Sequence, residues 1–362
     1  MSKLFKAFEI NGLRLKNRFI RSATVDNLGE KLKVSQKQLD LYRELALGET
    51  GLIISSGLFP SRDGWAAPGQ LGIHDDSMIP ELAKLVDIVH QNGGKIAAQL
   101  MHAGWFGNPG VSGYDVVGPS AMVNPANNLK VRELSSNEVF EHVEDFIQAA
   151  RRAVEAGFDA VQIHGAHGWF VSMFLSPVTN LRQDDWGGTP EKRANFITRT
   201  IRGIRQITGP DFPILIKLGL KDYHPEGKTV NEGIASALAC VRAGIDGVEV
   251  SEGIEEEPFH HIRPDAKNPY YLEECREARK SITKPLILVG GMRELADIRN
   301  VVEGGQADAI SMCRPFIMDQ HLVQKLRLGL VSKSDCISCN QCIQTMHDRN
   351  LHCVFNDGLL HY

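Results

Sequence analysis

The chain has 362 residues, 43% of them hydrophobic and 23% charged, which is the composition of an ordinary soluble globular protein. Its formal net charge of −4 gives no reason to expect a nucleic acid or an anionic membrane as a partner. No apolar run approaches a membrane span and no signal peptide is recognisable, so the seven cysteines indicate a reducing compartment rather than a disulfide framework. We therefore expect a cytoplasmic protein of enzyme size, and we expect a homo-oligomer.

Apolar runs typical of buried strands alternate along the chain with segments of helical periodicity. The runs are continuous, as a parallel sheet covered on both faces requires. The expected strands span residues 19–23, 51–57, 95–100, 160–165, 214–219, 247–253, 286–291 and 309–314. The expected helices span residues 39–47, 78–90, 136–157, 190–208, 230–243, 271–281, 293–303 and 320–328. Ser135 or Ser136 is the expected N-cap of the third helix, with Glu138 in its first turn.

This alternation predicts the fold class. Strands and helices in alternation favour a parallel sheet, and eight such units favour a closed (β/α)8 TIM barrel, with an open doubly wound sheet as the alternative. The Gly-, Pro- and Asn-rich passage at residues 101–128 is too long for an ordinary connection, so we interpret it as a loop insertion over the functional face. We expect two units, a barrel at residues 1–330 and a short cysteine-rich C-terminal extension at residues 331–362.

The segment A-V-Q-I-H-G-A-H-G-W at residues 160–169 carries two histidines where the fourth strand ends. His164 and His167 are three residues apart, so one turn of backbone can aim both rings at one point. Two imidazole donors that converge there would suit a site that holds a carbonyl oxygen and stabilises charge developing on it. The alternative is two unrelated histidines, one packed and one solvated. We expect these residues to bind substrate rather than a metal, because a catalytic metal usually needs three protein ligands.

In barrels of this class the reactive groups lie at the C-terminal ends of the strands. The other residues at these ends are Ser22, Ala23, Thr24, Gly57, Gln99, His102, Lys217, Ser251, Gly253, Gly290, Gly291, Cys313 and Arg314. The Gly and Cys-Arg pairs after strands seven and eight fall where such barrels usually hold a phosphate, although the glycines are also compatible with a simple tight turn.

Lys217 lies inside the apolar strand I-L-I-K-L, where an unpaired ammonium group would be costly. We expect it to meet an anion, for which the N1–C2=O locus of a reduced flavin is a good candidate. A buried structural ion pair is the alternative.

Four motifs give the chain a specific resemblance. They are N-R-F-I-R-S-A-T at residues 17–24, Q-L-M-H-A-G at 99–104, Q-I-H-G-A-H-G-W at 162–169 and F-L-S-P-V-T-N-L-R-Q-D-D-W-G-G at 174–188. Through them the chain resembles the flavin-dependent Old Yellow Enzyme family over residues 1 to about 330. The resemblance is strongest to the branch that includes bacterial 2,4-dienoyl-CoA reductase and trimethylamine dehydrogenase.

The resemblance implies FMN as cofactor, NAD(P)H as reductant, and a set of site residues. The FMN-binding residues would be Ser22, Ala23, Thr24, Gly57, Gln99, Lys217, Gly253, Gly291, Cys313 and Arg314. Within this set, Lys217 would lie near flavin N1, while Gly291, Cys313 and Arg314 would hold the phosphate. His164 and His167 would anchor the oxygen of a substrate, or a stacked nicotinamide, over the flavin.

The chain departs from the family pattern at three positions. Trp169 stands where family reductases usually carry a tyrosine that donates a proton, and an indole N–H is not a usable acid at neutral pH. Water, Tyr223, His102 or another group would then supply the proton, or Trp169 simply fills and shapes the pocket. Val25 replaces a Thr or Cys that hydrogen-bonds flavin C4=O in many members, and Cys313 replaces a common glycine.

Four cysteines cluster near the end of the chain: Cys336, Cys339, Cys342 and Cys353. Clustered thiolates suit a [4Fe–4S] cluster or zinc, and a tail without metal is the third possibility. The iron–sulfur relatives have a C-x2-C-x3-C spacing, one residue longer than the C-x2-C-x2-C found here. We also expect the chain, which ends at Tyr362, to lack the FAD and NAD(P)H domains of its longer relatives, so that a cluster would need an external electron partner.

The sequence thus predicts an FMN-dependent NAD(P)H oxidoreductase that transfers hydride through flavin N5 to a small polarised unsaturated substrate. Two alternatives stay open. One is an amine-type dehydrogenase that passes electrons to an external acceptor. The other is a flavin or iron–sulfur electron carrier without substrate chemistry of its own.

Overall fold

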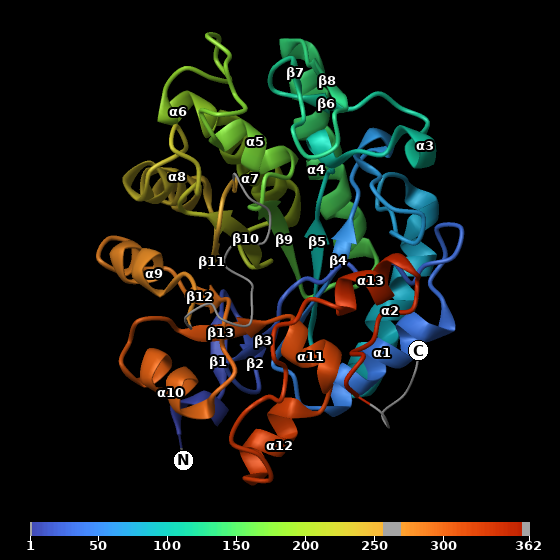
Figure 1. Cartoon of the computed structure of the whole chain (residues 1–362), viewed down its shortest axis with the longest axis vertical. Helices are drawn as coiled ribbons and strands as arrows, with labels where there is room; N and C mark the ends of the chain where they lie inside the picture. Colours follow the sequence, from blue (N-terminus) through green and yellow to red (C-terminus); the bar gives the residue numbers. More distant parts are fainter. Residues whose placement is uncertain (1, 256–268, 357–362) are drawn as a thin grey trace.

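Eight parallel strands close into a barrel at the centre of the molecule, which confirms the predicted fold class (Figure 1). The structure is a computed structural model in which residues 2–255 and 269–356 are described. The strands around the barrel are β3 (Phe19–Arg21), β4 (Leu52–Leu58), β5 (Ile96–Leu100), β9 (Ala160–Gly165), β10 (Ile214–Gly219), β11 (Gly247–Ser251), β12 (Leu286–Val289) and β13 (Ala309–Met312). All but Val289 of their apolar side chains are almost fully buried, as the continuous apolar runs indicated.

Helices surround the barrel near the predicted positions. The principal ones are α1 (Gln36–Leu47), α2 (Ile79–Gln91), α4 (Ser136–Glu155), α7 (Asn195–Thr208), α8 (Val230–Ala243), α9 (Leu272–Arg279), α10 (Leu295–Glu303) and α12 (Leu322–Leu328). Ser135 is the N-cap of α4, and it forms a capping box with Glu138. The single helix expected at residues 190–208 is wrong, because α6 (Pro190–Arg193) and α7 are separate helices that meet at Ala194.

Two strands that the sequence analysis did not separate from the leader close one end of the barrel. β1 (Phe8–Ile10) and β2 (Leu13–Leu15) form an antiparallel hairpin, whose turn at Asn11 and Gly12 has φ values of 45° and 79°. Positive φ at both central residues gives a turn whose twist matches the flanking strands. The inward residues of the hairpin are buried with Ile20 and other barrel residues, so the hairpin plugs the barrel.

The passage at residues 101–128 is more than the plain loop expected. It contains the 3-10 helix η4 (Gly104–Phe106), α3 (Pro109–Ser112), β6 (Val117–Gly118) and β7 (Met122–Val123). Together with β8 (Lys130–Glu133), the last two form a three-stranded sheet that lies beyond the arrowheads of β5 and β9 (Figure 1). The insertion therefore caps the C-terminal end of the barrel, the end expected to carry the site.

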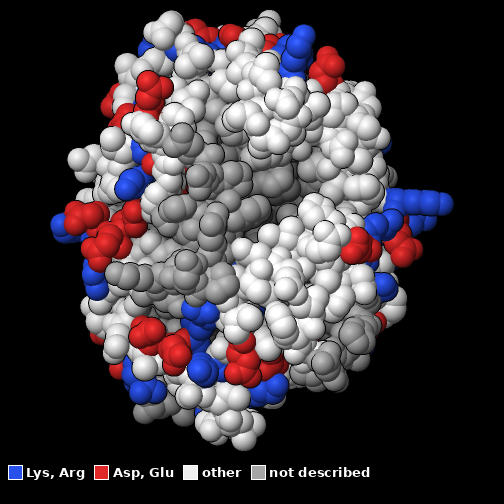
Figure 2. Space-filling model, in the orientation of Figure 1, with Lys and Arg blue, Asp and Glu red and all other residues white. Residues whose placement is uncertain are grey.

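Figure 2 shows one face of the molecule, on which charged side chains gather mainly around the periphery. Across residues 2–255 and 269–356, no helix combines the length and the hydropathy that crossing a bilayer requires. Three further short helices, α5 (Phe170–Leu175), α11 (Arg314–Met318) and α13 (Cys342–His347), flank the predicted site residues.

Candidate active site

His164 and His167 converge at the end of β9. Their ring centroids lie 5.1 Å apart with the planes 83° to each other. The backbone turns sharply here, because His167 adopts a φ of 59° and its N–H donates to the Glu252 carbonyl at 3.0 Å. The His167 Nε2 atom lies 2.7 Å from the hydroxyl of Ser251, which ends β11. The structure therefore brings the two predicted histidines together at the end of β9.

Both imidazoles are neutral at physiological pH. Burial, followed by His167 and Lys217, lowers the pKa of His164 well below its ordinary value. Burial and then Lys217 do the same to the pKa of His167. Within the described residues, the buried Nδ1 atom of His164 has no hydrogen-bond partner. A buried polar atom without a partner is costly, and a ligand oxygen or amide would satisfy it.

Trp169 and Tyr223 occupy different surroundings. Trp169 precedes α5, and its ring centroid lies 6.1 Å from that of His164 and 5.1 Å from that of Phe106. Tyr223, one of the candidate substitute acids, donates its hydroxyl to the Glu274 carboxylate at 2.9 Å. Burial and then Glu274 raise the pKa of Tyr223 far above its usual value, which makes it a poor proton donor.

Lys217 lies inside the barrel in a polar network of buried side chains. Its Nζ atom donates to Ser22 Oγ at 2.7 Å and lies 3.4 Å from the Glu249 carboxylate. The alternative of a buried ion pair is thus present, and the ammonium group still has a third proton to donate. Gln99, on β5, joins the same network through Gln162. The sequence analysis did not single out Glu249, because Glu249 lies in the middle of β11, whereas the expected site residues lie at the strand ends.

The expected phosphate-binding residues lie after β12 and β13. Gly290 and Gly291 have φ values of 102° and 73°, which favour glycine and fit both the tight turn and a backbone cradle. Arg314 Nη1 lies 2.9 Å from Asn340 Oδ1 and 3.5 Å from the Ser338 carbonyl. Its guanidinium is therefore also a support for the cysteine-rich segment, which the sequence analysis did not foresee.

The remaining expected cofactor residues surround the same mouth. Thr24 Oγ1 lies 3.1 Å from Cys313 Sγ, which joins the ends of β3 and β13. Gly253 follows β11, and a Cβ atom there would lie only 1.9 Å from Asp222 Oδ1, so the position admits no side chain. Gly57 pairs with Gln99 in the β4–β5 ladder, while Ala23 is half-buried beside the barrel core.

The four clustered cysteines line one cavity. It has a volume of about 220 Å³, and Cys336, Cys339, Cys342 and Cys353 all contribute to its wall together with Arg314. None of the four thiols forms a disulfide. Arg293 donates to the Cys336 carbonyl at 3.2 Å, so two arginines hold the cysteine-rich segment against the barrel.

Four thiolates around one cavity suit either of the metal centres expected from the sequence. A zinc ion takes four thiolates in a tetrahedron at about 2.3 Å, and a [4Fe–4S] cluster takes one thiolate on each iron. The lining of the cavity fits both groups.

Comparison with known proteins identifies the family. The sequence profile of the NADH:flavin oxidoreductase / NADH oxidase family matches residues 3–333. The chain belongs to this family. It is 33% identical to a NADH oxidase of Thermoanaerobacter brockii over 98% of this chain and 56% of that protein. It is 32% identical to a NADPH dehydrogenase of Geobacillus sp. (strain WCH70) over 88% of this chain and 92% of that protein.

A solved structure agrees. The structure of a 2-naphthoyl-CoA reductase in complex with 2-naphthoyl-CoA matches with a TM-score of 0.92 and 29% identity, over 96% of this chain and 56% of that chain. The chain spans about half the length of the first relative and of this reductase. Membership of the NADH:flavin oxidoreductase family confirms the resemblance and the oxidoreductase class, and it implies FMN with NAD(P)H as reductant. The donors around Lys217 and Gln99 and the glycine turn fit such a cofactor.

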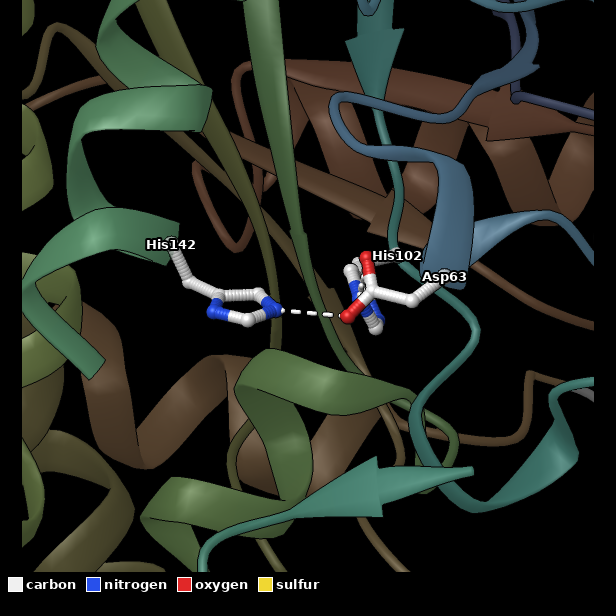
Figure 3. Close-up of side chains that lie close together, drawn as sticks. All are labelled: Asp63, His102 and His142. Carbon is white, nitrogen blue, oxygen red and sulfur yellow. Dashed lines mark hydrogen bonds and ion pairs between the residues drawn. The ribbon is translucent and has the colours of Figure 1, made fainter. Parts of the chain in front are cut away.

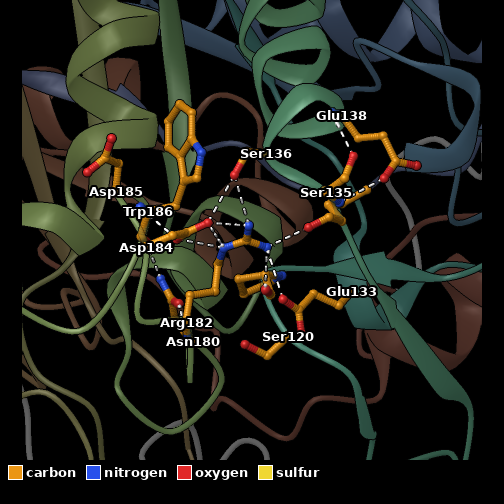
Figure 4. Close-up of polar contacts among 12 residues, drawn as sticks. Ser120, Glu133, Ser135, Ser136, Glu138, Asn180, Arg182, Asp184, Asp185 and Trp186 are labelled. Carbon is orange, nitrogen blue, oxygen red and sulfur yellow. Dashed lines mark hydrogen bonds and ion pairs between the residues drawn. The ribbon is translucent and has the colours of Figure 1, made fainter.

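The longest family motif, at residues 174–188, has a structural role here. Arg182 donates to the Pro119 and Leu134 carbonyls at 3.0 and 2.5 Å, and it pairs with Asp184 at 2.6 Å (Figure 4). Asn180 donates to the carbonyls of Phe174 and Trp186. The motif therefore fastens the segment after α5 to the cap over the barrel mouth.

Asp63, His102 and His142 form a triad in which the two histidines are buried and Asp63 is partly exposed (Figure 3). Its ligand atoms are close enough for a metal ion, but the hydrogen bonds argue against one. The His102 Nδ1 atom accepts the Gly104 N–H at 3.0 Å, so the ring proton is on Nε2, facing Asp63 at 3.2 Å. A metal ligand would need that Nε2 free of its proton. We therefore interpret the triad as an ion-paired support.

Proposed function

We propose that this chain is the FMN-binding barrel of an NAD(P)H-dependent reductase that acts on a small, polarised, unsaturated substrate. The observation that carries the proposal is the convergence of neutral His164 and His167 at the barrel mouth that also holds Lys217. The names of the relatives, a NADH oxidase, a NADPH dehydrogenase and a 2-naphthoyl-CoA reductase, support the same class.

The side chains would divide the work. FMN, when bound, would accept hydride from NAD(P)H and deliver it to the substrate. His164 Nδ1, which lacks a partner among the described residues, would hydrogen-bond the substrate oxygen together with His167 and polarise the conjugated double bond. Lys217 would donate its third proton near flavin N1, and Gln99 would meet the pyrimidine. Ser22, Ala23, Thr24, Gly57 and Gly253 would line the ring and ribityl chain, and Gly291, Cys313 and Arg314 would hold the phosphate.

The cofactor content can be tested directly. Protein reconstituted with FMN should show flavin absorption bands, and anaerobic mixing with NADH or NADPH should bleach them rapidly. Replacing both His164 and His167 by Ala should leave FMN content unchanged and abolish binding of phenols, which stack on such flavins. A colourless, folded protein after reconstitution, or unchanged phenol affinity in the double variant, would contradict the proposal.

The second part of the proposal concerns the tail. We propose that Cys336, Cys339, Cys342 and Cys353 bind a [4Fe–4S] cluster, because all four line one cavity and clustered thiolates are the ligands of such clusters. Iron and sulfide analysis of anaerobically purified protein tests this, with four of each per chain expected. Zinc in place of iron, or neither, would reject it.

A cluster next to the barrel also favours a second function, in which a substrate is oxidised and electrons leave through the tail to an external acceptor. Rapid flavin reduction by an amine rather than by NAD(P)H would select that function. Reduction by neither, with electron exchange alone, would select the carrier. We also propose a homo-oligomer, which light scattering of the purified protein tests.

A further inference from the structure

Glu249 lies at the centre of the polar network inside the barrel. It is the third residue of β11, and its side chain is fully buried. Its partners come from β9, β10 and β13 and from Ser22, the residue that follows β3, so it ties the barrel together at one level.

The Glu249 side chain is an ionised carboxylate. Its Oε1 atom accepts the hydroxyls of Ser22 and Ser311 at 2.7 and 2.8 Å, and its Oε2 atom accepts Gln162 Nε2 at 2.7 Å. Lys217 Nζ lies 3.4 Å away. Burial alone would raise the pKa of Glu249, but Lys217 and the three hydrogen bonds hold it below its ordinary value. The negative charge therefore faces Lys217 and compensates it.

The carboxylate also fixes the orientation of two amides. Because a carboxylate only accepts, Gln162 must turn its NH2 group toward Glu249. Its Oε1 atom then accepts Gln99 Nε2 at 2.8 Å. One N–H of the Gln99 amide therefore donates to Gln162, and the Gln99 Oε1 atom is left to accept a hydrogen bond from a ligand. Glu249 thus fixes which way the Gln99 amide is oriented, through the two hydrogen bonds of Gln162.

We propose that Glu249 is a positioning residue for the flavin, which sets its reduction potential through Lys217 and its pyrimidine contact through Gln99. The inference rests on the proposed binding of FMN. Hydride transfer from NAD(P)H adds two electrons and one proton to the flavin, leaves one negative charge near N1, and releases NAD(P)+. An unpaired Lys217 would stabilise that charge strongly. The neighbouring carboxylate weakens this stabilisation, keeps the potential low, and makes the reduced flavin a better hydride donor.

The test compares two variants in FMN-loaded protein. Glu249→Gln keeps the shape and can still accept from Gln162, but it removes the charge beside Lys217. We expect the equilibrium for two-electron reduction to shift at least tenfold toward reduced flavin, or about 30 mV upward. Gln162→Met keeps the charges of Lys217 and Glu249 but removes the two hydrogen bonds that join Glu249 to Gln99. It should leave the potential within 10 mV on the same scale but weaken FMN binding about tenfold.

The potential of Glu249→Gln and the FMN affinity of Gln162→Met each test the inference. An unchanged or lower potential in Glu249→Gln, or unaltered FMN affinity in Gln162→Met, would overturn the inference. If Glu249→Gln does not fold, the double variant Lys217→Met/Glu249→Gln, which removes both charges of the pair, is compared with wild type. Because Glu249 compensates the charge of Lys217, the double variant should keep a potential within about 30 mV of wild type. A larger fall would show that Lys217 acts uncompensated and would overturn the inference. Wild-type protein that binds no FMN would instead reject the proposed function, so the two failures are distinguishable.

Discussion

The substitution Asp63→Asn tests the triad of Asp63, His102 and His142. Asp63 lies on the 3-10 helix η2 (Arg62–Gly64), 2.8 Å from His142 Nε2 and 3.2 Å from His102 Nε2. His142 also bonds the Glu138 carbonyl through Nδ1, at 2.8 Å. A histidine that donates from both nitrogens is an imidazolium, so removing the carboxylate leaves a buried cation without its partner.

The expected cost follows from the burial of the partners. Breaking a buried ion pair by removing one partner costs about 3–5 kcal/mol. The side chains of Asp63 and His142 are 17% and 10% exposed, so we expect the lower end of this range, about 3 kcal/mol of unfolding free energy. Asp75→Asn is the matched control, because Asp75 pairs with His74 but is 44% exposed. It should cost less than about 1 kcal/mol.

The cost should depend on pH with a definite sign. Burial alone would lower the pKa of His142, but the hydrogen bond and charge of Asp63 outweigh burial and raise it. A raised histidine pKa gives stability that is present below the unfolded value near 6.5 and lost as pH rises through the folded value. Burial would raise the pKa of Asp63, but His102 and His142 lower it far, so its contribution is lost only in acid.

Unfolding of wild type and variant should therefore differ most between about pH 4 and 6.5 and less at pH 8.5. Denaturant or thermal unfolding of both proteins at pH 5.5 and 8.5 measures this difference. Contributions of the titrating groups that the two proteins share cancel when the unfolding free energy of the variant is subtracted from that of wild type. A cost for Asp63→Asn below about 1 kcal/mol at pH 5.5, or one that does not decline at pH 8.5, would refute the reasoning.

Three further predictions concern the cap, the tail and the missing acid. Arg182→Met removes a 5% exposed cation that donates to two carbonyls, so it should cost about 2–4 kcal/mol in thermal unfolding, because both acceptors lose their donor, and it should expose residues 119–134 to protease. Cys339→Ser should lower the iron content measured by metal analysis without lowering FMN content. Trp169→Tyr should speed reoxidation of reduced flavin by cyclohexenone about 10²–10⁴-fold and leave reduction by NAD(P)H unchanged in stopped-flow traces. No gain there would mean that another group already supplies the proton.

The barrel could be predicted because its signals are local. Each strand is a short apolar run with a turn residue after it, and the helices carry caps such as Ser135 that act within four residues. The bounds of β10 and α8 were predicted to the residue. The hairpin at residues 8–15 and the three-stranded cap were missed because their strands have two to four residues, too few to show a period.

The polar partners were not predictable for a different reason. Asp63, His102 and His142 come from three separate elements, and nothing in the sequence near any one of them indicates the other two. Glu249 alternates with valines in β11, which is the pattern of a half-solvated strand, yet its side chain faces a filled barrel interior. Only closure of the barrel brings Lys217 to it, and closure is a property of the whole chain.

The two proposed cofactor sites meet at consecutive residues of the chain. Cys313 contacts Thr24, which is expected to line the flavin, while Arg314 holds Asn340 and the Ser338 carbonyl beside the cysteine cavity. A loss of the cysteine-rich segment would therefore remove the Asn340 and Ser338 partners of Arg314, and a loss of phosphate would remove a charge that orients its guanidinium. Because the same guanidinium serves both sides, iron and FMN content must be measured together in every variant of either site. If Arg314 serves both sites, a substitution at Arg314 alone must change both the iron content and the FMN content.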